Sequence, residues 1–420
     1  MENYTIKNAV PAGKSAPRDV HITDGVIAAA PAPDARVINA AGLTLFPGLA
    51  DAHTHFRDPG FTRKEDIQSG AAAAAAGGVT TALCMPNTSP VIDTPELVRY
   101  VLDAAKNAAA TVLPIAAVTV GQKGVALTDF AALKSAGAAA LSDDGSPVSS
   151  ADVMRRALIA ASAAGLVIIS HCEDADMVKN YAVNEGEVSR RLGIPGRPAI
   201  AEELMVARDC MLALETGARA HIAHVSTAGS VEIIRRAKAL GAPVTAETCP
   251  QYFTLTEDEI LRRGPLARVN PPLRTRRDVD AVIAGLCDGT LDIIVTDHAP
   301  HTDEEKARPL GDAPSGMIGL ETSLAVTLTE LYRTGILPLA GIAVKMSQRP
   351  AELFGLPTNS VAAGETANLT LVDLNEEWTV TREDFRSKSK NSAFLGKVLR
   401  GRVKLTISRG GIVYGGQYVV

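Results

Sequence analysis

Short apolar segments alternate with longer amphipathic segments between about residues 48 and 300. Eight of the apolar segments have the length of a strand, and most are apolar throughout instead of alternating with polar residues. Fully apolar strands are typical of a parallel sheet that is covered on both faces. The predicted strands cover residues 49–53, 79–84, 112–118, 138–142, 166–170, 220–223, 243–247 and 292–296.

The segments between these strands carry the signals of helices. Pro95, after Thr94, takes the first position of a helix predicted to run through residues 96–107, where a missing backbone N–H costs little. The alanine run at residues 71–76 indicates a close-packed helix. Eight strands with helices between them predict an α/β fold, a (β/α)8 TIM-type barrel.

The two ends of the sequence have a different pattern, with short β-like pieces and many turn residues. Neither end is long enough to bury a good sheet alone. We therefore expect residues 1–45 and 359–420 to form one small β-sandwich domain together. Residues 46–358 would then form the catalytic barrel.

Composition narrows the class of protein. Of the 420 residues, 46% are hydrophobic and 21% are charged, as in globular proteins. The net charge of -5 and the lack of a basic block argue against nucleic acid as a partner. The five cysteines have no CxxC spacing, and no apolar stretch approaches the roughly 20 residues that span a bilayer. We expect a soluble, cytoplasmic protein with reduced thiols and no membrane partner.

Metal-ligand side chains follow five of the predicted strands, at the end of a barrel where catalytic groups lie. His53 and His55 are two apart on an extended segment, so both side chains leave on the same side and can share one ion. Imidazoles and carboxylates are ligands for zinc-like ions. The candidate ligands are His53, His55, Asp143 or Asp144, His171, His224 and Asp297.

These donors are too many for one tetrahedral ion and suit two ions about 3.5–4 Å apart, bridged by a carboxylate. Spacing alone leaves open whether Asp143 or Asp144 faces the ions. Asp297, at the end of the last strand, is the natural group to shuttle a proton.

Several motifs carry a family resemblance. Asp51-Ala52-His53-Thr54-His55, His171-Cys172-Glu173, His221–Ser226 and Asp297–His301 together resemble the amidohydrolase superfamily. More narrowly, His55–Gly60, Met85–Thr88, Ser142–Gly145 and Val269–Arg274 resemble the bacterial class I dihydroorotases. The motifs occur in family order over essentially the whole chain.

The resemblance implies two Zn²⁺ per subunit, with Asp144 as the bridge. One ion would be held by His53, His55, Asp144 and Asp297, and the other by Asp144, His171 and His224. Asp297 would be the catalytic residue. The implied substrate-binding residues are His55, Arg57, Asn87, Asn270, His301, Ser315 and Gly316. Many relatives have Phe in place of Ser315, so the resemblance implies a contact from its backbone and does not extend to its side chain.

The family's reaction is the reversible cyclisation of N-carbamoyl-L-aspartate to (S)-dihydroorotate in pyrimidine biosynthesis. The residue types of this chain suit that chemistry. Two ions held by the candidate ligands would polarise a carbonyl, and the planar donors of Arg57 match the substrate carboxylate. The resemblance also implies a homodimer and association with another pyrimidine-pathway enzyme.

Two other functions share part of this sequence pattern. Residues 247–252 are similar to dihydropyrimidinases and allantoinases, but those enzymes bridge their ions with a carbamylated lysine on strand 4. The strand here has no lysine, and Lys134 lies in the preceding helix. A non-catalytic dihydroorotase-like scaffold would have lost metal ligands, whereas this chain keeps all six.

Other polar residues near these strand ends are interpreted as structural. Glu173 and Glu247 are expected to hydrogen-bond ligating imidazoles or the barrel rim. His221 is expected to face away from the ions, because it lies three residues before His224 on the same strand. Cys172 and His298 are interpreted as packing or supporting residues.

Overall fold

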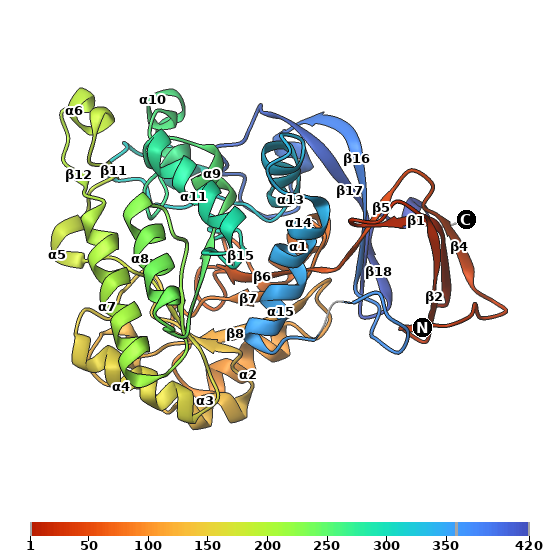
Figure 1. The fold of residues 1–420 in the computed structure, drawn as a ribbon, viewed down its shortest axis with the longest axis horizontal. Coiled ribbons are helices and arrows are strands. Elements are labelled where there is room, and N and C mark those ends of the chain that lie inside the picture. Colours follow the sequence, from red (N-terminus) through yellow and green to blue (C-terminus); the bar gives the residue numbers. More distant parts are fainter. Residues whose placement is uncertain (1, 358–359, 419–420) are drawn as a thin grey trace.

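The computed structural model of the protein describes residues 2–357 and 360–418. Figure 1 shows a body of alternating helices and strands with a β-sheet layer projecting from one side, and both ends of the chain lie at that layer. The predicted boundary between residues 358 and 359 lies outside the described residues. The division into two domains stays a prediction.

Eight parallel strands form the barrel, and each overlaps one of the strands predicted from the apolar segments. Their order in the sheet is their order in the chain. The backbone N–H of His55 donates to the carbonyl oxygen of His298 at 2.8 Å, which brings the last strand end back to the first. The (β/α)8 prediction is confirmed. The strands are β6 (Leu49–Thr54), β7 (Val79–Cys84), β8 (Thr111–Ala116), β9 (Ala140–Leu141), β10 (Ile168–Ser170), β13 (Ala220–Ile222), β14 (Val244–Thr248) and β15 (Ile293–Ile294).

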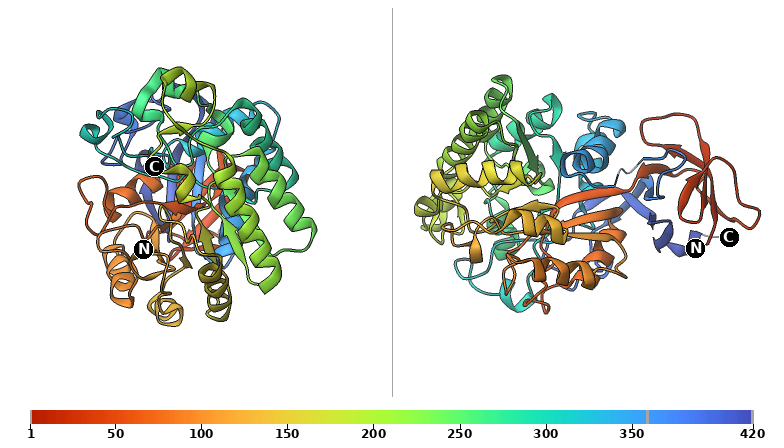
Figure 2. Two further views of the ribbon diagram at one scale, coloured as in Figure 1. Left: turned by 90° about the vertical axis from the view of Figure 1, so that its left-hand side faces the viewer. Right: turned by 90° about the horizontal axis from the view of Figure 1, so that it is seen from below.

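Helices cover the barrel, and Figure 2 shows them around the strands in two further views. The longest described helix is α7, and none of the described helices is long and apolar enough to cross a bilayer. They are α1 (Ile67–Ala76), α2 (Pro95–Ala104), α3 (Phe130–Ala136), α4 (Ala151–Ala163), α5 (Ala175–Val178), α6 (Glu187–Leu192), α7 (Ile200–Thr216), α8 (Ala228–Ala239), α9 (Pro250–Thr254), α10 (Glu259–Arg263), α11 (Arg276–Asp288), α12 (Asp303–Lys306), α13 (Ser323–Thr327), α14 (Leu339–Ala343) and α15 (Arg349–Phe354).

Two helices show how local sequence sets the fold. Thr94 caps α2 by accepting from the backbone N–H of Leu97, and Pro95 takes the first helical position as predicted. In α1, four alanines of the predicted run are buried. Gly70 of the same helix lies against the Phe56 ring, where an added Cβ would sit 2.5 Å from a ring carbon. The small residues of α1 therefore let the helix approach the segment that follows β6.

The two ends of the chain form a second sheet, as predicted. Its order is β18-β17-β16-β5-β1-β2-β3, with β4 beside β1, and the antiparallel pair of β5 and β16 joins the two ends. Its own core includes Ile6, Ile22, Ile38, Leu371 and Ile407. The strands are β1 (Tyr4–Pro11), β2 (Arg18–Thr23), β3 (Val26–Ala28), β4 (Arg36–Asn39), β5 (Thr44–Pro47), β16 (Leu369–Thr379), β17 (Val398–Ser408) and β18 (Gly411–Tyr414).

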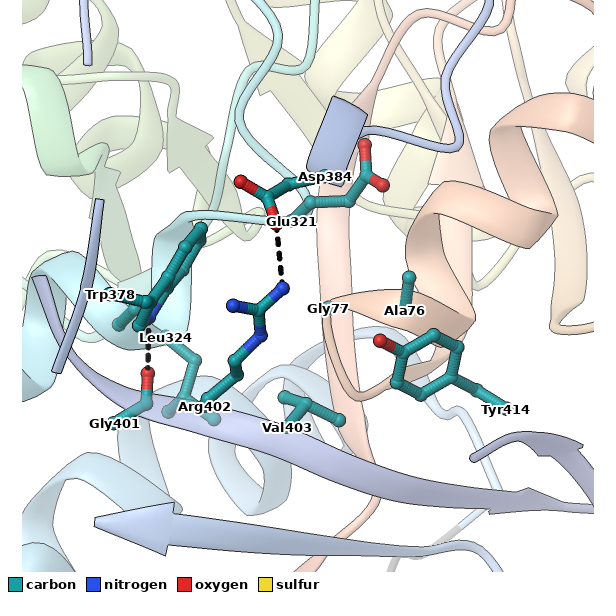
Figure 3. Close-up of a pocket in the computed structure, with 11 residues that line it drawn as sticks. Ala76, Gly77, Glu321, Leu324, Trp378, Asp384, Gly401, Arg402, Val403 and Tyr414 are labelled. Carbon is teal, nitrogen blue, oxygen red and sulfur yellow. Dashed lines mark hydrogen bonds and ion pairs between the residues drawn. The ribbon is translucent and has the colours of Figure 1, made fainter. Parts of the chain in front are cut away.

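Figure 3 shows where β17 passes the end of α1. Arg402 donates to Asp384 at 2.6 Å and lies over the Trp378 ring, whose indole N–H donates to Gly401 at 3.1 Å. The cavity among these residues is only about 30 Å³, about the size of one water molecule. This junction therefore joins the sheet to the barrel.

Candidate active site

A cavity of about 170 Å³ opens at the carboxyl ends of the barrel strands. With the exception of His53, every residue that the sequence assigned to the site lines it. Its walls are His55, Arg57, Asn87, Asp144, Gly145, His171, His224, Asn270, Asp297, Ala299, His301, Ser315 and Gly316.

The first group of candidate ligands gathers at the end of β6. Nε2 of His55 lies 3.0 Å from Oδ1 of Asp297 and 3.5 Å from Oδ2 of Asp144. Nε2 of His53 lies 3.5 Å from Oδ1 of Asp144 and 3.6 Å from Oδ1 of Asp297. Two imidazoles and two carboxylates from three strand ends therefore point at one small region.

The second group of candidate ligands, His171 and His224, also lies close to Asp144. Oδ1 of Asp144 is 3.2 Å from Nδ1 of His171 and 3.5 Å from Nε2 of His224. The two imidazoles approach each other to 2.8 Å. Asp144 is the carboxylate that touches both groups, which is the position a bridging ligand requires.

These side chains fit a metal site. The ligand atoms of His53, His55 and Asp297 lie within 4.8 Å of one another, and so do those of His53, Asp144 and His224. Among the described residues, Nε2 of His53 is buried without a hydrogen-bond partner, although two carboxylates face it. A buried polar atom rarely stays unpaired, and a cation among these donors would satisfy it.

The electrostatics of the site point the same way. Burial lowers the pKa of His53, but the carboxylates of Glu247 and Asp144 raise it well above its ordinary value. Burial also lowers the pKa of His171. The carboxylates of Asp144 and Glu173 outweigh this effect and raise the pKa to about 10. The carboxylates thus provide a strongly negative site that attracts positive charge, whether protons or a metal ion.

Glu247 contacts two buried histidines, one of them the candidate ligand His53. Its Oε1 lies 2.6 Å from Nδ1 of His53, and its Oε2 lies 3.1 Å from Nε2 of His221. The His221 ring packs edge-on against Phe354 and faces away from the ligands, as expected. Glu247 therefore orients the candidate ligand His53, in agreement with its predicted hydrogen bond to an imidazole of the site.

Three site residues have backbones in the left-handed region, which non-glycine residues rarely adopt. The φ angles are 60° at Arg57, 33° at His224 and 49° at Asp297. Such conformations cost free energy and persist where the surrounding structure enforces them, most often at functional sites.

A second set of lining residues carries nitrogen donors and lies around His301. Nε of Arg57 donates to Pro300 at 3.3 Å, and its Nη2 lies 3.4 Å from Nε2 of His301. The carbonyl oxygen of Ser315 is 2.9 Å from the same nitrogen of His301. The Ser315 hydroxyl accepts from Arg268 at 3.3 Å, so this side chain is tied to the protein.

Asn87 and Asn270 contact imidazoles of the ligand cluster. Oδ1 of Asn87 lies 2.9 Å from Nδ1 of His55, and its Nδ2 lies 3.3 Å from Asp144. Nδ2 of Asn270 lies 3.3 Å from Nε2 of His171. Both amides line the cavity and also contact candidate ligands, a contact that the motifs did not indicate.

Three supporting residues were missed by the sequence. Arg197, on the short β11–β12 sheet (Val183–Asn184 and Gly196–Arg197), pairs with Glu173 at 2.7 Å and contacts Asn270. Asn391 accepts from the backbone N–H of His301 at 3.0 Å and donates to the carbonyl of Gly316 at 3.1 Å. Lys64 lies 3.2 Å from Nδ1 of His301. No spacing or motif in the sequence marks them.

The residues interpreted as structural have partners of their own. Asp143 accepts from the backbone N–H groups of Val118 and Thr119 at 2.8 and 3.2 Å, and its burial raises its pKa to about 6. Nε2 of His298 lies 3.4 Å from Glu65. Cys172 is buried, with Sγ 3.5 Å from Asp209. None of these side chains lines the cavity described above.

A parallel barrel whose strand ends gather histidines and aspartates defines the amidohydrolase class of enzymes. Among solved structures, an L-hydantoinase (dihydropyrimidinase) from Arthrobacter aurescens has the same fold, with a TM-score of 0.86 and 26% identity over 98% of this chain and 96% of that one. The model of the dihydro-orotase-like family matches residues 42–230.

Relatives at higher identity give the family. A dihydroorotase from Pelotomaculum thermopropionicum is 48% identical over 96% of this chain and 95% of its own length. One from Ruminiclostridium cellulolyticum is 50% identical over 89% of this chain and 88% of its own length. This chain belongs to the dihydroorotase family.

Proposed function

We propose that this enzyme is a metal-dependent dihydroorotase, which interconverts N-carbamoyl-L-aspartate and (S)-dihydroorotate with release or uptake of water. The observation that carries the proposal is one cavity with two walls. One wall holds the two aspartates and three of the four histidines of the candidate metal cluster, and Arg57 and His301 present nitrogen donors on the other. The first wall suits cyclic-amide chemistry, and the second suits a carboxylate beside the ring.

The metal residues would be His53, His55, Asp144, His171, His224 and Asp297, with Asp144 shared between two ions. Bound there, the ions would lower the pKa of a water molecule and polarise the ring carbonyl. Asp297 would carry a proton between water and the ring nitrogen, because its carboxylate lines the cavity beside His55. The strained backbone of Asp297 favours a fixed direction for that carboxylate.

Recognition of the substrate would rest on the opposite wall. The guanidinium of Arg57 offers parallel N–H groups that match both oxygens of a carboxylate. His301 lies beside it, and Asn87 and Asn270 lie against the ligand cluster. The backbone of Ser315 and Gly316 closes the wall, and a Cβ at Gly316 would sit 2.7 Å from that of Ala299.

A dihydropyrimidinase activity is the alternative, because the hydantoinase named above shares the fold. Its substrates lack the ring carboxylate, so Arg57 would have no partner. The strand that would carry a bridging lysine, β9, contains only Ala140 and Leu141, and Lys134 lies on α3. The position of Asp144 favours a carboxylate bridge.

Further features of the family are proposed for this chain on the same basis. We expect two Zn²⁺ per subunit, a homodimer, a cytoplasmic location and association with another pyrimidine-pathway enzyme.

A turnover assay tests the proposed function. Protein of known metal content would be compared on dihydroorotate, dihydrouracil and allantoin, and we expect turnover of dihydroorotate to exceed the others by orders of magnitude. Arg57→Lys should raise KM for dihydroorotate, since a point charge cannot replace the fork. Equal or faster turnover of dihydrouracil would contradict the proposal.

A further inference from the structure

Two contacts determine which ring nitrogen of His301 carries hydrogen. Nδ1 lies 3.2 Å from Nζ of Lys64, and an ammonium group can only donate. Nε2 lies 2.9 Å from the carbonyl oxygen of Ser315, which can only accept. Nη2 of Arg57, which is also a donor, lies farther from Nε2, at 3.4 Å. Only the neutral imidazole with its hydrogen on Nε2 satisfies the two closer neighbours.

Glu305 is the carboxylate nearest to Nδ1, but it is otherwise engaged. Its Oε2 lies 3.6 Å from Nδ1, beyond hydrogen-bond distance, and accepts from the backbone N–H of Thr302 at 3.1 Å. Its Oε1 pairs with Lys64 at 3.1 Å and with Arg63 at 3.0 Å. Lys64 thus donates to Nδ1 and also neutralises the group that would otherwise draw a hydrogen to that nitrogen.

The charges around the ring also keep it neutral. His301 is only 5% exposed. Burial lowers its pKa, and the positive charges of Arg57, Lys64 and Lys306 lower it further. Glu305 is the one carboxylate in contact with the ring among the described residues, and its charge is shared with two cations.

We propose that Lys64 is a positioning residue that holds His301 as the neutral tautomer with hydrogen on Nε2. The ring then offers an N–H donor beside the Arg57 guanidinium, on the wall of the cavity. An anionic substrate group would accept from the guanidinium and would share the Nε2–H with the carbonyl oxygen of Ser315. The identity of that group as the carboxylate of dihydroorotate rests on the proposed function, whereas the tautomer does not.

Removal of the ammonium weakens the preference, because one of the two contacts that place the hydrogen on Nε2 is lost while the contact to Ser315 remains. In Lys64→Met, Nδ1 has no donor, and Glu305 is left with less compensating charge 3.6 Å away. At high pH part of the protein would then carry the single ring hydrogen on Nδ1, towards Glu305. In that form Nε2 would accept from Arg57 and would have no hydrogen for the substrate. At low pH a second proton from solvent would restore the Nε2–H.

Nitrogen NMR of the metal-loaded protein tests the tautomer directly, with ¹⁵N-labelled histidine and His301→Gln to assign the signals. We expect Nε2 of His301 to carry hydrogen and Nδ1 to lack it throughout about pH 6 to 9. In Lys64→Met, hydrogen should appear on Nδ1. Arg63→Met is the matched control, because Arg63 pairs with the same carboxylate but does not contact His301, and it should behave as wild type. Hydrogen on Nδ1 in the wild type, or no change in Lys64→Met, would overturn the proposal.

Kinetics provide the second measurement. In Lys64→Met, KM for dihydroorotate should rise with pH, reaching about tenfold above wild type at the alkaline end, with kcat within about threefold. Lys64→Arg should remove most of that pH dependence. An increase in KM that is equal at all pH values would indicate a merely structural role and count against the proposal. If the wild type fails to turn over dihydroorotate, the proposed function is wrong, and the NMR result still decides the tautomer.

Discussion

Oε1 of Glu247 lies 2.6 Å from Nδ1 of His53, and both side chains are completely buried. A carboxylate in this position fixes the ring so that Nε2 faces Asp144 and Asp297. It also makes the imidazole a stronger ligand, because it shares the hydrogen on Nδ1. Burial opposes the charge of Glu247, but His53 and His221 hold its pKa far below the ordinary value.

Replacement of this carboxylate should weaken metal binding. Glu247→Gln keeps the shape but loses the charge, and we expect affinity for Zn²⁺ to fall about 10- to 100-fold. A competition titration against a chelator measures it. Glu185→Gln removes an exposed carboxylate and should leave affinity unchanged. Unaltered affinity in Glu247→Gln would show that His53 is oriented by other groups.

Asp143 and Asp144 are neighbours in the chain, but replacement of each by asparagine should have a different effect. Asp144→Asn should lower kcat more than about a hundredfold and reduce metal content, because an amide cannot bridge two ions. Asp143→Asn should keep its metal and lose stability by about 1–3 kcal/mol, because it disturbs contacts to Val118 and Thr119. Metal analysis and urea unfolding of both variants separate the two effects. Near-normal turnover in Asp144→Asn would contradict the two-metal arrangement.

Metal removal should make stability depend on pH. In the metal-free protein the pKa of His171 is raised from 6.5 to about 10. The folded state therefore holds a proton that the unfolded state releases above its own pKa, so stabilisation is complete below pH 6.5 and is lost as pH rises towards 10. Urea unfolding of chelated protein should show this decline.

The metal-loaded protein serves as the comparison, because a bound ion replaces the proton on the ligand. Its free energy of unfolding should change less over the same pH range. His171→Gln should flatten the decline in chelated protein. A decline of the same steepness with and without metal would mean that His171 does not cause it.

The cysteines should differ sharply in reactivity. Cys287 is exposed, whereas Cys84, Cys172, Cys210 and Cys249 are buried. Burial raises the pKa of Cys84 and of Cys210 to about 12, which disfavours the reactive thiolate. A thiol reagent should label one cysteine in the native protein and all five after unfolding. Cys287→Ser should abolish the native labelling, and a second fast-reacting thiol would contradict this account.

The barrel was predictable because its signals are local. A buried parallel strand requires a continuous apolar segment, and residues 79–84, for example, form β7 with the predicted bounds. The ends of those strands then locate Asp144, His171 and His224 at the cavity. The bounds of helices were less certain, since α2 ends at Ala104 instead of residue 107.

The supporting residues were not predictable, because their partners are distant in the sequence. Asn391 contacts the backbone of His301 from 90 residues away. Lys64 contacts the same histidine and precedes it by 237 residues in the sequence. Neither residue has a pattern that distinguishes it from an ordinary polar residue, and only the folded chain brings each to the ring.

The contact of Asn391 with His301 and Gly316 also has a consequence for synthesis on the ribosome. All six candidate metal ligands have been made by residue 297. The residue that ties the opposite wall together is made almost a hundred positions later, within a segment whose side chains pack into the barrel core. A nascent barrel can thus assemble its ligand cluster early, while the wall that would face the substrate is completed only when the last strands emerge.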